Sequence, residues 1–331
     1  MAKRFIYMDY AAATPMDLAV VAAMQPYFSE RFYNPSALYA AGLEARADVE
    51  KARAAVAHRF GARPSEIVFT AGATEANNLA IHGVMRRYPQ ANLVVSAVEH
   101  DSVLAPAGQY GRLLAPVHAD GLVDTAALTK LIDDHTVLVS VQYANNEVGT
   151  IQPLKEVSRS VRSIRMERQR AGNKLPLYLH TDAAQAAGYL ELHAMRLGAD
   201  LISINGGKIY GPKQSGALYV GAGIVLSPLI HGGGQERGLR SGTENVAGCI
   251  GLATALDLVQ SDRRTQAVRM RALQELFLQE LGEKVPAATV NGSRKHRLPN
   301  NIHVTIPGQD NERLLFGLDE AGVQAATGSA C

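Results

Sequence analysis

The sequence has few cysteines and no long apolar run, and each absence excludes a class of protein. Only two cysteines occur among 331 residues, Cys249 and Cys331, and neither belongs to a CxxC pair or a Cys/His cluster. A disulfide framework and a structural zinc site are therefore not indicated. No run of 18 apolar residues is present, and the opening MAKRFIYMDY lacks the apolar centre of a signal peptide. We therefore expect a cytoplasmic protein with no membrane partner.

The sequence also lacks a strong excess of one charge. Its 33 Lys and Arg against 31 Asp and Glu give a net charge of +2, too little to indicate nucleic acid or an anionic membrane as the main partner. Arginines do gather between Lys155 and Arg170, where the pattern predicts a helix. RNA could use that stripe, but it contains no aromatic residues that would stack on bases. We favour a solvated outer helix and expect no direct nucleic-acid partner.

What the sequence does contain is enough apolar material for a large core. Hydrophobic residues make up 47% of the chain, which predicts one large domain and a smaller one. A polar break over Ser261–Arg264 separates a helix that ends near Val259 from a second helix, Ala267–Leu281. We place the domain boundary there, with a large domain over 14–260 and a small C-terminal domain over 261–331.

A short apolar run followed by a sharp turn predicts that Lys208 lies at the end of a buried strand. The run is Leu201–Ile204, and Gly206 and Gly207 stand between it and the lysine. A lysine held at a strand end beside apolar neighbours has a lowered pKa, and its neutral amine can condense with a carbonyl. The alternative is a surface lysine in a hairpin that leads to the next strand, GALYV.

A second apolar strand, predicted over Leu175–Leu179, leads to Asp182, with Gln185 three residues beyond. In an open α/β sheet, ligands bind outside the carboxyl ends of the strands, so Asp182 and Lys208 could face one ligand. Pyridoxal phosphate requires this pair, because the lysine holds its aldehyde as a Schiff base and the carboxylate keeps its ring nitrogen protonated. The alternative for Asp182 is a helix N-cap.

A possible phosphate site follows the strand predicted over Glu66–Thr70. The chain passes through Gly72 into a helix predicted over Glu75–Val84. The backbone N–H groups and the positive dipole end of such a helix suit a phosphate. Thr74 could add its hydroxyl there, or it could be an ordinary N-cap.

Two further strand ends carry polar candidates. His100 follows a strand predicted over Asn92–Val98 and could stack over a planar ring or carry a proton, although a lone histidine is more often structural. Asn146 follows a strand predicted over Val137–Gln142, and its amide could bond a ring hydroxyl. Asparagine is also common in turns, which is the alternative here.

A glycine-rich loop and the two cysteines complete the list of candidates. The loop His231–Gly238 leads through Thr243 into a helix, and it could contact a phosphate, contact a second subunit or be a mobile surface loop. Cys249 stands among apolar helical residues, which favours a small buried side chain. Cys331, in the terminal TGSAC, is exposed enough to act as a nucleophile, and an inert thiol is the alternative.

Together these stretches closely resemble the cysteine desulfurases of the NifS/IscS type, in the class V aminotransferase group of fold-type I pyridoxal-phosphate enzymes. The resemblance runs almost from end to end. Its motifs are DYAAATP at 9–15, NPS at 34–36, GATEANN at 72–78, EH at 99–100, NNEVG at 145–149, DAAQ at 182–185, KIYGPK at 208–213, HGGGQERGLRSGT at 231–243 and GSAC at 328–331.

The resemblance implies both a fold and a set of residue roles. The fold is α/β, with a mostly parallel seven-stranded sheet between helices, an N-terminal arm over 1–13 that joins the small domain, and a small α+β domain that is incomplete relative to the family. The implied roles are Lys208 as the Schiff-base lysine, Asp182 on the pyridine nitrogen, His100 stacked on the ring, Asn146 and Gln185 near the ring hydroxyl, Ala73 and Thr74 on the phosphate, Thr243 on the phosphate of the partner subunit's cofactor, and Cys331 as the thiol that takes up sulfur.

This sequence departs from the family pattern in two places. Where the family usually carries Ser-x-His before the lysine, this chain has Asn205-Gly206-Gly207, so one hydroxyl and one imidazole contact are absent, while Asn205 can still donate one hydrogen bond. Family members also continue beyond the thiol and supply an arginine that clamps the substrate carboxylate, and no residue here matches it. If the polypeptide ends at Cys331, we expect cysteine binding to be weaker by roughly 1.5 to 3 kcal/mol, with slow turnover.

The function that the resemblance implies is a homodimeric cysteine desulfurase that converts L-cysteine to L-alanine. Cys331 would carry the sulfur as a persulfide to an acceptor protein, either an iron–sulfur scaffold or a relay for tRNA thiolation. One alternative is a selenocysteine lyase or another class V pyridoxal-phosphate lyase or aminotransferase. The other is a catalytically weakened family member that acts as a binding scaffold.

Overall fold

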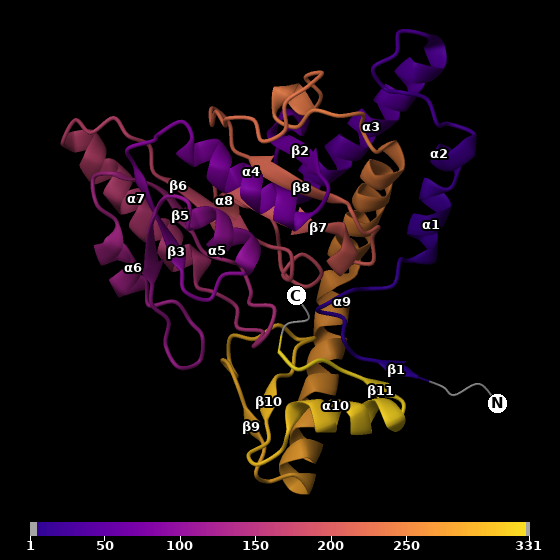
Figure 1. Cartoon of the computed structure of the whole chain (residues 1–331), viewed down its shortest axis with the longest axis vertical. Helices are drawn as coiled ribbons and strands as arrows, with labels where there is room; N and C mark the ends of the chain where they lie inside the picture. Colours follow the sequence, from indigo (N-terminus) through magenta and orange to yellow (C-terminus); the bar gives the residue numbers. More distant parts are fainter. Residues whose placement is uncertain (1–4, 329–331) are drawn as a thin grey trace.

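The computed structural model describes residues 5–328, and its main body is built on one sheet (Figure 1). Within these residues the sheet has seven strands in the order β2-β8-β7-β6-β5-β3-β4. Strand β8 is antiparallel to both of its neighbours, and all the other pairs are parallel. The strands are β2 (Ile67–Thr70), β3 (Asn92–Ser96), β4 (Gly111–Ala115), β5 (Thr136–Ser140), β6 (Tyr178–Asp182), β7 (Leu201–Asn205) and β8 (Gly216–Val220). The predicted mostly parallel seven-stranded sheet is confirmed.

Helices cover both faces of this sheet. Helices α4 and α5 pack on one face, and α3, α6, α7 and the first part of α9 pack on the other. The α-helices are α1 (Leu18–Met24), α2 (Pro26–Ser29), α3 (Ala40–Phe60), α4 (Ala73–Met85), α5 (Asp101–Ala107), α6 (Thr125–Leu131), α7 (Leu154–Arg170), α8 (Ala194–Leu197), α9 (Val246–Lys284) and α10 (Asn311–Glu320), and the short 3-10 helices are η1 (Pro64–Glu66), η2 (Gly206–Lys208) and η3 (Glu236–Gly238).

Apart from the edge strand β4, which is mostly exposed, the strands of the sheet appear in the sequence as largely apolar runs because both of their faces are buried. In β2, Ile67 and Phe69 belong to the core on the α3 side, whereas Val68 belongs to the core on the α4 side. Successive side chains of a strand point to opposite faces, so a strand covered by helices on both sides needs apolar residues at nearly every position. The run lengths therefore predicted where these strands lie.

Some boundaries differ from the prediction. Strand β6 begins at Tyr178 and not at Leu175, because Pro176 has no N–H to donate to a neighbouring strand. Helix α4 begins at Ala73 and not at Glu75, so Thr74 lies inside the helix and is not its N-cap.

The first and last described residues lie side by side, next to the far half of α9 (Figure 1). Strand β1 (Ile6–Tyr7) pairs in parallel with β11 (Val323–Gln324), and β9 (Thr289–Val290) pairs antiparallel with β10 (Val304–Thr305). The chain therefore returns at its end to the segment that precedes α1. The division into a large and a small domain stays a prediction.

Helix α9 is continuous over 39 residues, and the break predicted over Ser261–Arg264 is wrong. Its residues from Val246 to Leu256 are mostly buried, whereas most of those beyond Leu256 are not. The polar stretch marks the point where the helix leaves the core, since Asp and Arg are tolerated inside an exposed helix. The predicted boundary between 260 and 261 falls inside this helix.

Within residues 5–328, no helix combines the length and the apolar character needed to cross a membrane.

Candidate active site

Lys208 lies at the carboxyl end of β7, on the short helix η2, and is half-buried. The turn that carries it is held by Asn205, whose Oδ1 accepts a hydrogen bond from the N–H of Gly207 at 3.0 Å. A Cβ atom on Gly206 would lie 2.1 Å from Ser215 Oγ and 3.0 Å from the carbonyl oxygen of Pro212. Only glycine fits there, so close packing beneath the turn fixes the position of the lysine.

The N-terminal segment forms one wall of the site. Lys208 Nζ donates to the carbonyl oxygens of Ala11 and Ala12 at 2.7 and 2.6 Å. Thr14 Oγ1 donates to the carbonyl of Gly207 at 3.1 Å and ties the same segment to the lysine turn. The surroundings expected to be apolar therefore include two main-chain acceptors.

Asp182 ends β6, the neighbour of β7, and its side chain is nearly buried, with the residue 7% exposed. Its Oδ1 accepts the N–H of Ala184 at 2.8 Å and its Oδ2 accepts the amide of Asn77 at 2.6 Å. Burial raises the pKa of Asp182, while those two hydrogen bonds and the nearby charge of Lys208 lower it. The strand end thus presents a buried carboxyl group that is held by two hydrogen-bond donors and lies near the charge of Lys208.

His100 has a structural role and also borders the pocket, while its stacking over a ring and its transfer of a proton stay predictions. It is the N-cap of α5, where its Nδ1 accepts the N–H of Ser102 at 3.0 Å. The oxygen Oγ of the same serine lies 2.9 Å from Nδ1. The residue also lines the pocket that contains Lys208 and Asp182. One ring nitrogen is thus used by the fold, and the residue still borders the cavity.

These residues surround an inner pocket of about 80 Å³, which is lined by eight of the predicted site residues. Those that line it are Lys208, Asp182, His100, Ala73, Thr74, Asn146, Gln185 and Asn205. An outer hollow of about 650 Å³ adjoins it and shares Lys208, Asn205, Thr74, Ala73 and Ala12. The predicted residues therefore come together around one cavity, although their chemical roles stay predictions.

The end of the pocket formed by α4 suits a phosphate. Gly72, at φ 134°, is the N-cap of this 13-residue helix, and no side chain caps it. The first-turn N–H groups and the positive end of the helix dipole are therefore available beside Ala73 and Thr74, which line both cavities. A bound anion would satisfy them.

The turn role that we considered for Asn146 belongs to its neighbour. Asn145 is buried, and its Oδ1 accepts the N–H of Glu147 at 2.9 Å, while Asn146 lines the inner pocket. Gln185 lines the pocket too and donates from Nε2 to the carbonyl of Ala11 at 3.0 Å. Both amides thus border the cavity, and Gln185 also contacts its N-terminal wall.

Thr243 lies outside this pocket. It lines a separate hollow of about 210 Å³ near the glycine-rich loop. The loop is anchored by a buried ion pair between Arg53 and Glu236 at 2.7 Å, and by a second pair between Arg240 and Glu75 at 2.9 Å. Thr243 is thus held in a hollow beside the start of α4, separate from the pocket that Lys208 lines.

The two cysteines are placed very differently. Cys249 is buried in α9, and burial raises the pKa of its thiol, which fits the predicted apolar role. Cys331 lies outside the described residues. Gly328, the last described residue, lines the inner pocket.

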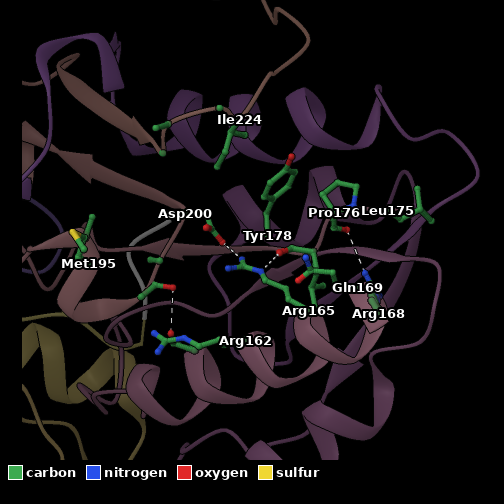
Figure 2. A pocket seen from close by; sticks show the side chains of 18 of the residues that line it. Arg162, Arg165, Arg168, Gln169, Leu175, Pro176, Tyr178, Met195, Asp200 and Ile224 are labelled. Carbon is green, nitrogen blue, oxygen red and sulfur yellow. Dashed lines mark hydrogen bonds and ion pairs between the residues drawn. The ribbon is translucent and has the colours of Figure 1, made fainter. Parts of the chain in front are cut away.

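A larger cleft, of about 980 Å³, lies at the opposite end of the sheet, and among residues 5–328 none of the predicted site residues lines it (Figure 2). Its arginines come from α7. Arg165 pairs with Asp200, and Arg168, itself buried, donates to the carbonyl of Thr136 at 2.8 Å. The prediction of a solvated outer helix therefore holds for exposed residues such as Arg162, while Arg165 and Arg168 bind the strands.

The chemical groups that line the inner pocket fit pyridoxal phosphate. It combines an amine for the aldehyde, a buried carboxyl group for the ring nitrogen and a helix N-terminus for the phosphate. A carboxylate offers four lone-pair sites, and the described residues donate two hydrogen bonds to Asp182. Acceptor capacity therefore remains for a protonated ring nitrogen.

Known proteins share this architecture. The chain matches the family model of the aminotransferases of class V over residues 6–331. It is 40% identical over 336 residues to the cysteine desulfurase IscS of Dictyoglomus turgidum (strain DSM 6724 / Z-1310), an alignment that covers 99% of this chain and 82% of that protein. It is also 40% identical over 332 residues to cysteine desulfurase IscS 1 of Archaeoglobus fulgidus, covering 98% and 84%.

Solved structures agree. A NifS-like protein superposes with a TM-score of 0.91 at 34% identity, covering 98% of this chain and 87% of that one. A structure of SspA in complex with cysteine gives 0.81 at 32% identity, covering 98% and 89%. With the sheet, the helices and a pocket that fits the cofactor, these matches show that the chain belongs to the class V aminotransferases, a family of pyridoxal-phosphate enzymes, and within them to the NifS/IscS group of cysteine desulfurases.

Proposed function

We propose that this protein is a pyridoxal-phosphate-dependent cysteine desulfurase, which converts L-cysteine to L-alanine and retains the sulfur as a persulfide. The observation that carries this proposal is the meeting of Lys208, Asp182 and His100 around one inner pocket. The similarity of the whole chain to proteins named cysteine desulfurase, and to a structure named as a complex with cysteine, supports the choice of substrate.

In this proposal the cofactor is held at three points. Lys208 attaches to its aldehyde, Asp182 pairs with its ring nitrogen, and the first turn of α4 at Ala73 and Thr74 binds its phosphate. When bound, pyridoxal phosphate supplies an electron sink for the electrons released at the substrate Cα. The ring is bordered by His100, Asn146, Gln185 and Asn205, which also line the inner pocket.

Lys208 has a second task, which is to move a proton. Once the substrate amine has replaced it, its Nζ takes the proton from the substrate Cα. The carbonyls of Ala11 and Ala12, which accept hydrogen bonds from Nζ at 2.7 and 2.6 Å, offer a resting position for the released amine. The N-terminal wall would thus keep the base within reach of the substrate.

The sulfur step belongs to Cys331 in this proposal. Its thiolate attacks the substrate sulfur, an S–S bond forms and the substrate Cβ–S bond breaks. The electron pair of the broken bond stays on the carbon skeleton, which takes up protons and leaves as alanine. Gly328, three positions earlier, lines the inner pocket, which supports this choice of nucleophile.

We also propose a homodimer. Large apolar side chains are exposed on α1, α2 and the segment that leads to α3, and a surface of this kind typically marks an interface. They include Leu18 at 84%, Phe28 at 62%, Phe32 at 66%, Leu38 at 87% and Tyr39 at 57% exposure. The position of Thr243 outside its own inner pocket supports a role at the partner's phosphate across an isologous interface.

The sulfur acceptor in this proposal is a protein of iron–sulfur cluster assembly or of tRNA thiolation, and the name IscS of the relatives favours the first. We propose a cytoplasmic location, because thiol and persulfide chemistry of this kind needs a compartment that keeps cysteines reduced.

The proposal is tested by loading the protein with pyridoxal phosphate and measuring alanine released from L-cysteine, with L-selenocysteine as a parallel substrate. We expect alanine in equal amount to the sulfur transferred, and its loss in Cys331→Ser. Absence of alanine from a loaded wild-type protein would overturn the function. Turnover that survives Cys331→Ser would overturn only the choice of nucleophile.

A further inference from the structure

The proposed mechanism does not use Asn77, a polar side chain buried beside the site. Asn77 lies in α4 and is 0% exposed. Its Nδ2 donates to Asp182 Oδ2 at 2.6 Å and to Ser102 Oγ at 2.8 Å. Its Oδ1 is buried and has no hydrogen-bond partner among residues 5–328. Burial of an unpaired amide oxygen costs free energy, so the contacts of Nδ2 point to a task other than stability.

The first contact fixes the plane of the Asp182 carboxylate. A flipped Asn77 amide would set its oxygen against Asp182 Oδ2, and two acceptors at 2.6 Å repel each other. Nδ2 therefore faces the carboxylate. Because Ala184 donates to Oδ1, each oxygen of Asp182 has one donor from the fold. Rotation of the carboxylate would break at least one of these bonds, and one lone pair on each oxygen remains for a ligand.

The second contact reaches His100. Ser102 Oγ lies 2.9 Å from His100 Nδ1, and the Ser102 N–H donates to the same atom at 3.0 Å. A backbone N–H can only donate, so Nδ1 is an acceptor and the imidazole hydrogen is on Nε2. Since Ser102 Oγ accepts from Asn77, its own hydrogen can point to Nδ1. These side chains form a row of hydrogen bonds, Asn77–Ser102–His100, in which Asn77 donates to Ser102 and Ser102 donates to His100.

We propose that Asn77 is a positioning residue, which holds Asp182 and, through Ser102, His100 in one fixed arrangement around the cofactor ring. The inference rests on the proposed function, in which these two side chains meet the ring nitrogen and the ring face. Asn77 is the point where α4, α5 and β6 are joined by side-chain bonds. One amide therefore sets the relative placement of two groups that come from different elements.

The test is the dissociation constant of pyridoxal phosphate, measured by titrating the cofactor-free protein, and it requires no turnover. We expect Asn77→Leu to weaken binding about ten- to a hundredfold, because a charge-assisted hydrogen bond to Asp182 is lost. In an Asp182→Asn background the same change should cost only about twofold, since the carboxylate to be positioned is gone. An unchanged constant, or an equal loss in both backgrounds, overturns the proposal.

The chain offers a matched control at the other end of the sheet. Asn92 Nδ2 donates to both oxygens of Asp133 at 3.0 Å, and its Oδ1 is likewise buried without a partner in the described part. Asn92→Leu should leave cofactor binding unchanged. A loss as large as that of Asn77→Leu would show a general effect of removing an amide whose oxygen is buried and unpaired, and would overturn the specific role.

A second variant and a spectrum keep the proposal testable if Asn77→Leu fails to fold. Ser102→Ala removes only the middle of the row and should weaken cofactor binding several-fold, whereas Ser102→Thr should restore it. In the cofactor-free wild type, nitrogen NMR of labelled histidine should show His100 Nδ1 without a hydrogen, and a protonated Nδ1 overturns the assigned row. Alanine release by the wild type tests the proposed function, whereas the cofactor titrations test the role of Asn77. Failure of one is therefore distinguishable from failure of the other.

Discussion

The two ends of the main sheet both carry charged side chains, but the fold uses them differently. At the carboxyl end, Lys208, Asp182 and His100 surround a pocket of about 80 Å³, and Asp182 retains acceptor capacity beyond the two hydrogen bonds that the fold donates to it. At the amino end, Arg165 and Arg168 line a cleft of about 980 Å³, but they are paired with Asp200 and with backbone carbonyls. The difference teaches that unused hydrogen-bonding capacity marks a site better than volume does.

The strongest test of this comparison is Lys208→Ala. We expect loss of covalent cofactor attachment and a fall in alanine release of about a thousandfold or more, because the variant lacks both the attachment point and the base. The measurement is borohydride reduction followed by intact mass, beside the alanine assay. Lys213→Met, which changes a lysine that donates to the carbonyl of Thr14, should keep the covalent link. A reduced adduct on Lys208→Ala would assign the cofactor to another lysine.

At the amino end of the sheet, substitutions are expected to lower stability and to leave cofactor binding unchanged. Arg168→Met should lower the free energy of unfolding by about 3 kcal/mol, because buried carbonyls such as those of Thr136 and Pro176 lose their donor. Urea unfolding measures this loss, and cofactor affinity should not change. Arg162→Met, at an exposed position in the same cleft, should stay within about 0.5 kcal/mol. Weakened cofactor binding in Arg168→Met would contradict the separation of the two ends.

His180 lies between the two ends of the sheet, and because of its burial we expect the folded protein to lose stability in acid. It is fully buried between Ser140 Oγ and Ser203 Oγ, at 2.8 and 3.0 Å, and burial lowers its pKa to about 3. The unfolded chain takes up this proton near pH 6.5. The stabilisation is therefore complete above about pH 6.5 and is lost as pH falls toward about 3. From pH 7 to 5 the loss is about 2 kcal/mol, measurable by urea unfolding.

The control for that prediction is His180→Gln, which cannot titrate. The variant is expected to be less stable at pH 7, yet its stability should change less between pH 7 and 5 than that of the wild type. An equal change in both proteins would show that other groups cause the loss in acid.

The smallest expected effect concerns Thr243, which lies outside the inner pocket. Thr243→Ala should weaken cofactor retention by about 1 kcal/mol, the value of one lost hydrogen bond. The loss should appear only in the dimer, because in the proposed assembly this hydroxyl serves the partner subunit. Cofactor release measured at several protein concentrations, with light scattering for the mass, checks this. A monomer that holds its cofactor equally well with either residue would contradict the shared site.

The carboxyl end could be predicted from the sequence because of how parallel strands are buried. Lys208, Asp182 and His100 each follow an apolar run, and neighbouring parallel strands bring the ends of such runs to one edge of the sheet. The number of strands, their mostly parallel arrangement and the assigned role of each side chain came from the resemblance to a family. The residues alone left a structural alternative open for each side chain.

Other parts of the site could not be predicted, for physical reasons. The contact between Asn77 and Asp182 spans 105 positions, and an asparagine inside a helix gives no sign of which neighbour it faces. Ala11 and Ala12 contribute carbonyl oxygens, which every residue has, so their side chains carry no signal. The break expected over Ser261–Arg264 is absent because those polar residues reflect contact with solvent rather than an end of the helix.

The uninterrupted helix α9 also has a mechanical consequence. At 1.5 Å per residue its 39 residues make a rod about 58 Å long, and it contains no proline at which it could bend. Motion of the C-terminal elements would therefore turn the rod as a lever instead of folding at a hinge. Because β11 pairs with β1, that motion would pull on the segment whose Ala11 and Ala12 carbonyls hold Lys208. A movement of the C-terminal elements would thus change the position of the carbonyl groups that hold Lys208.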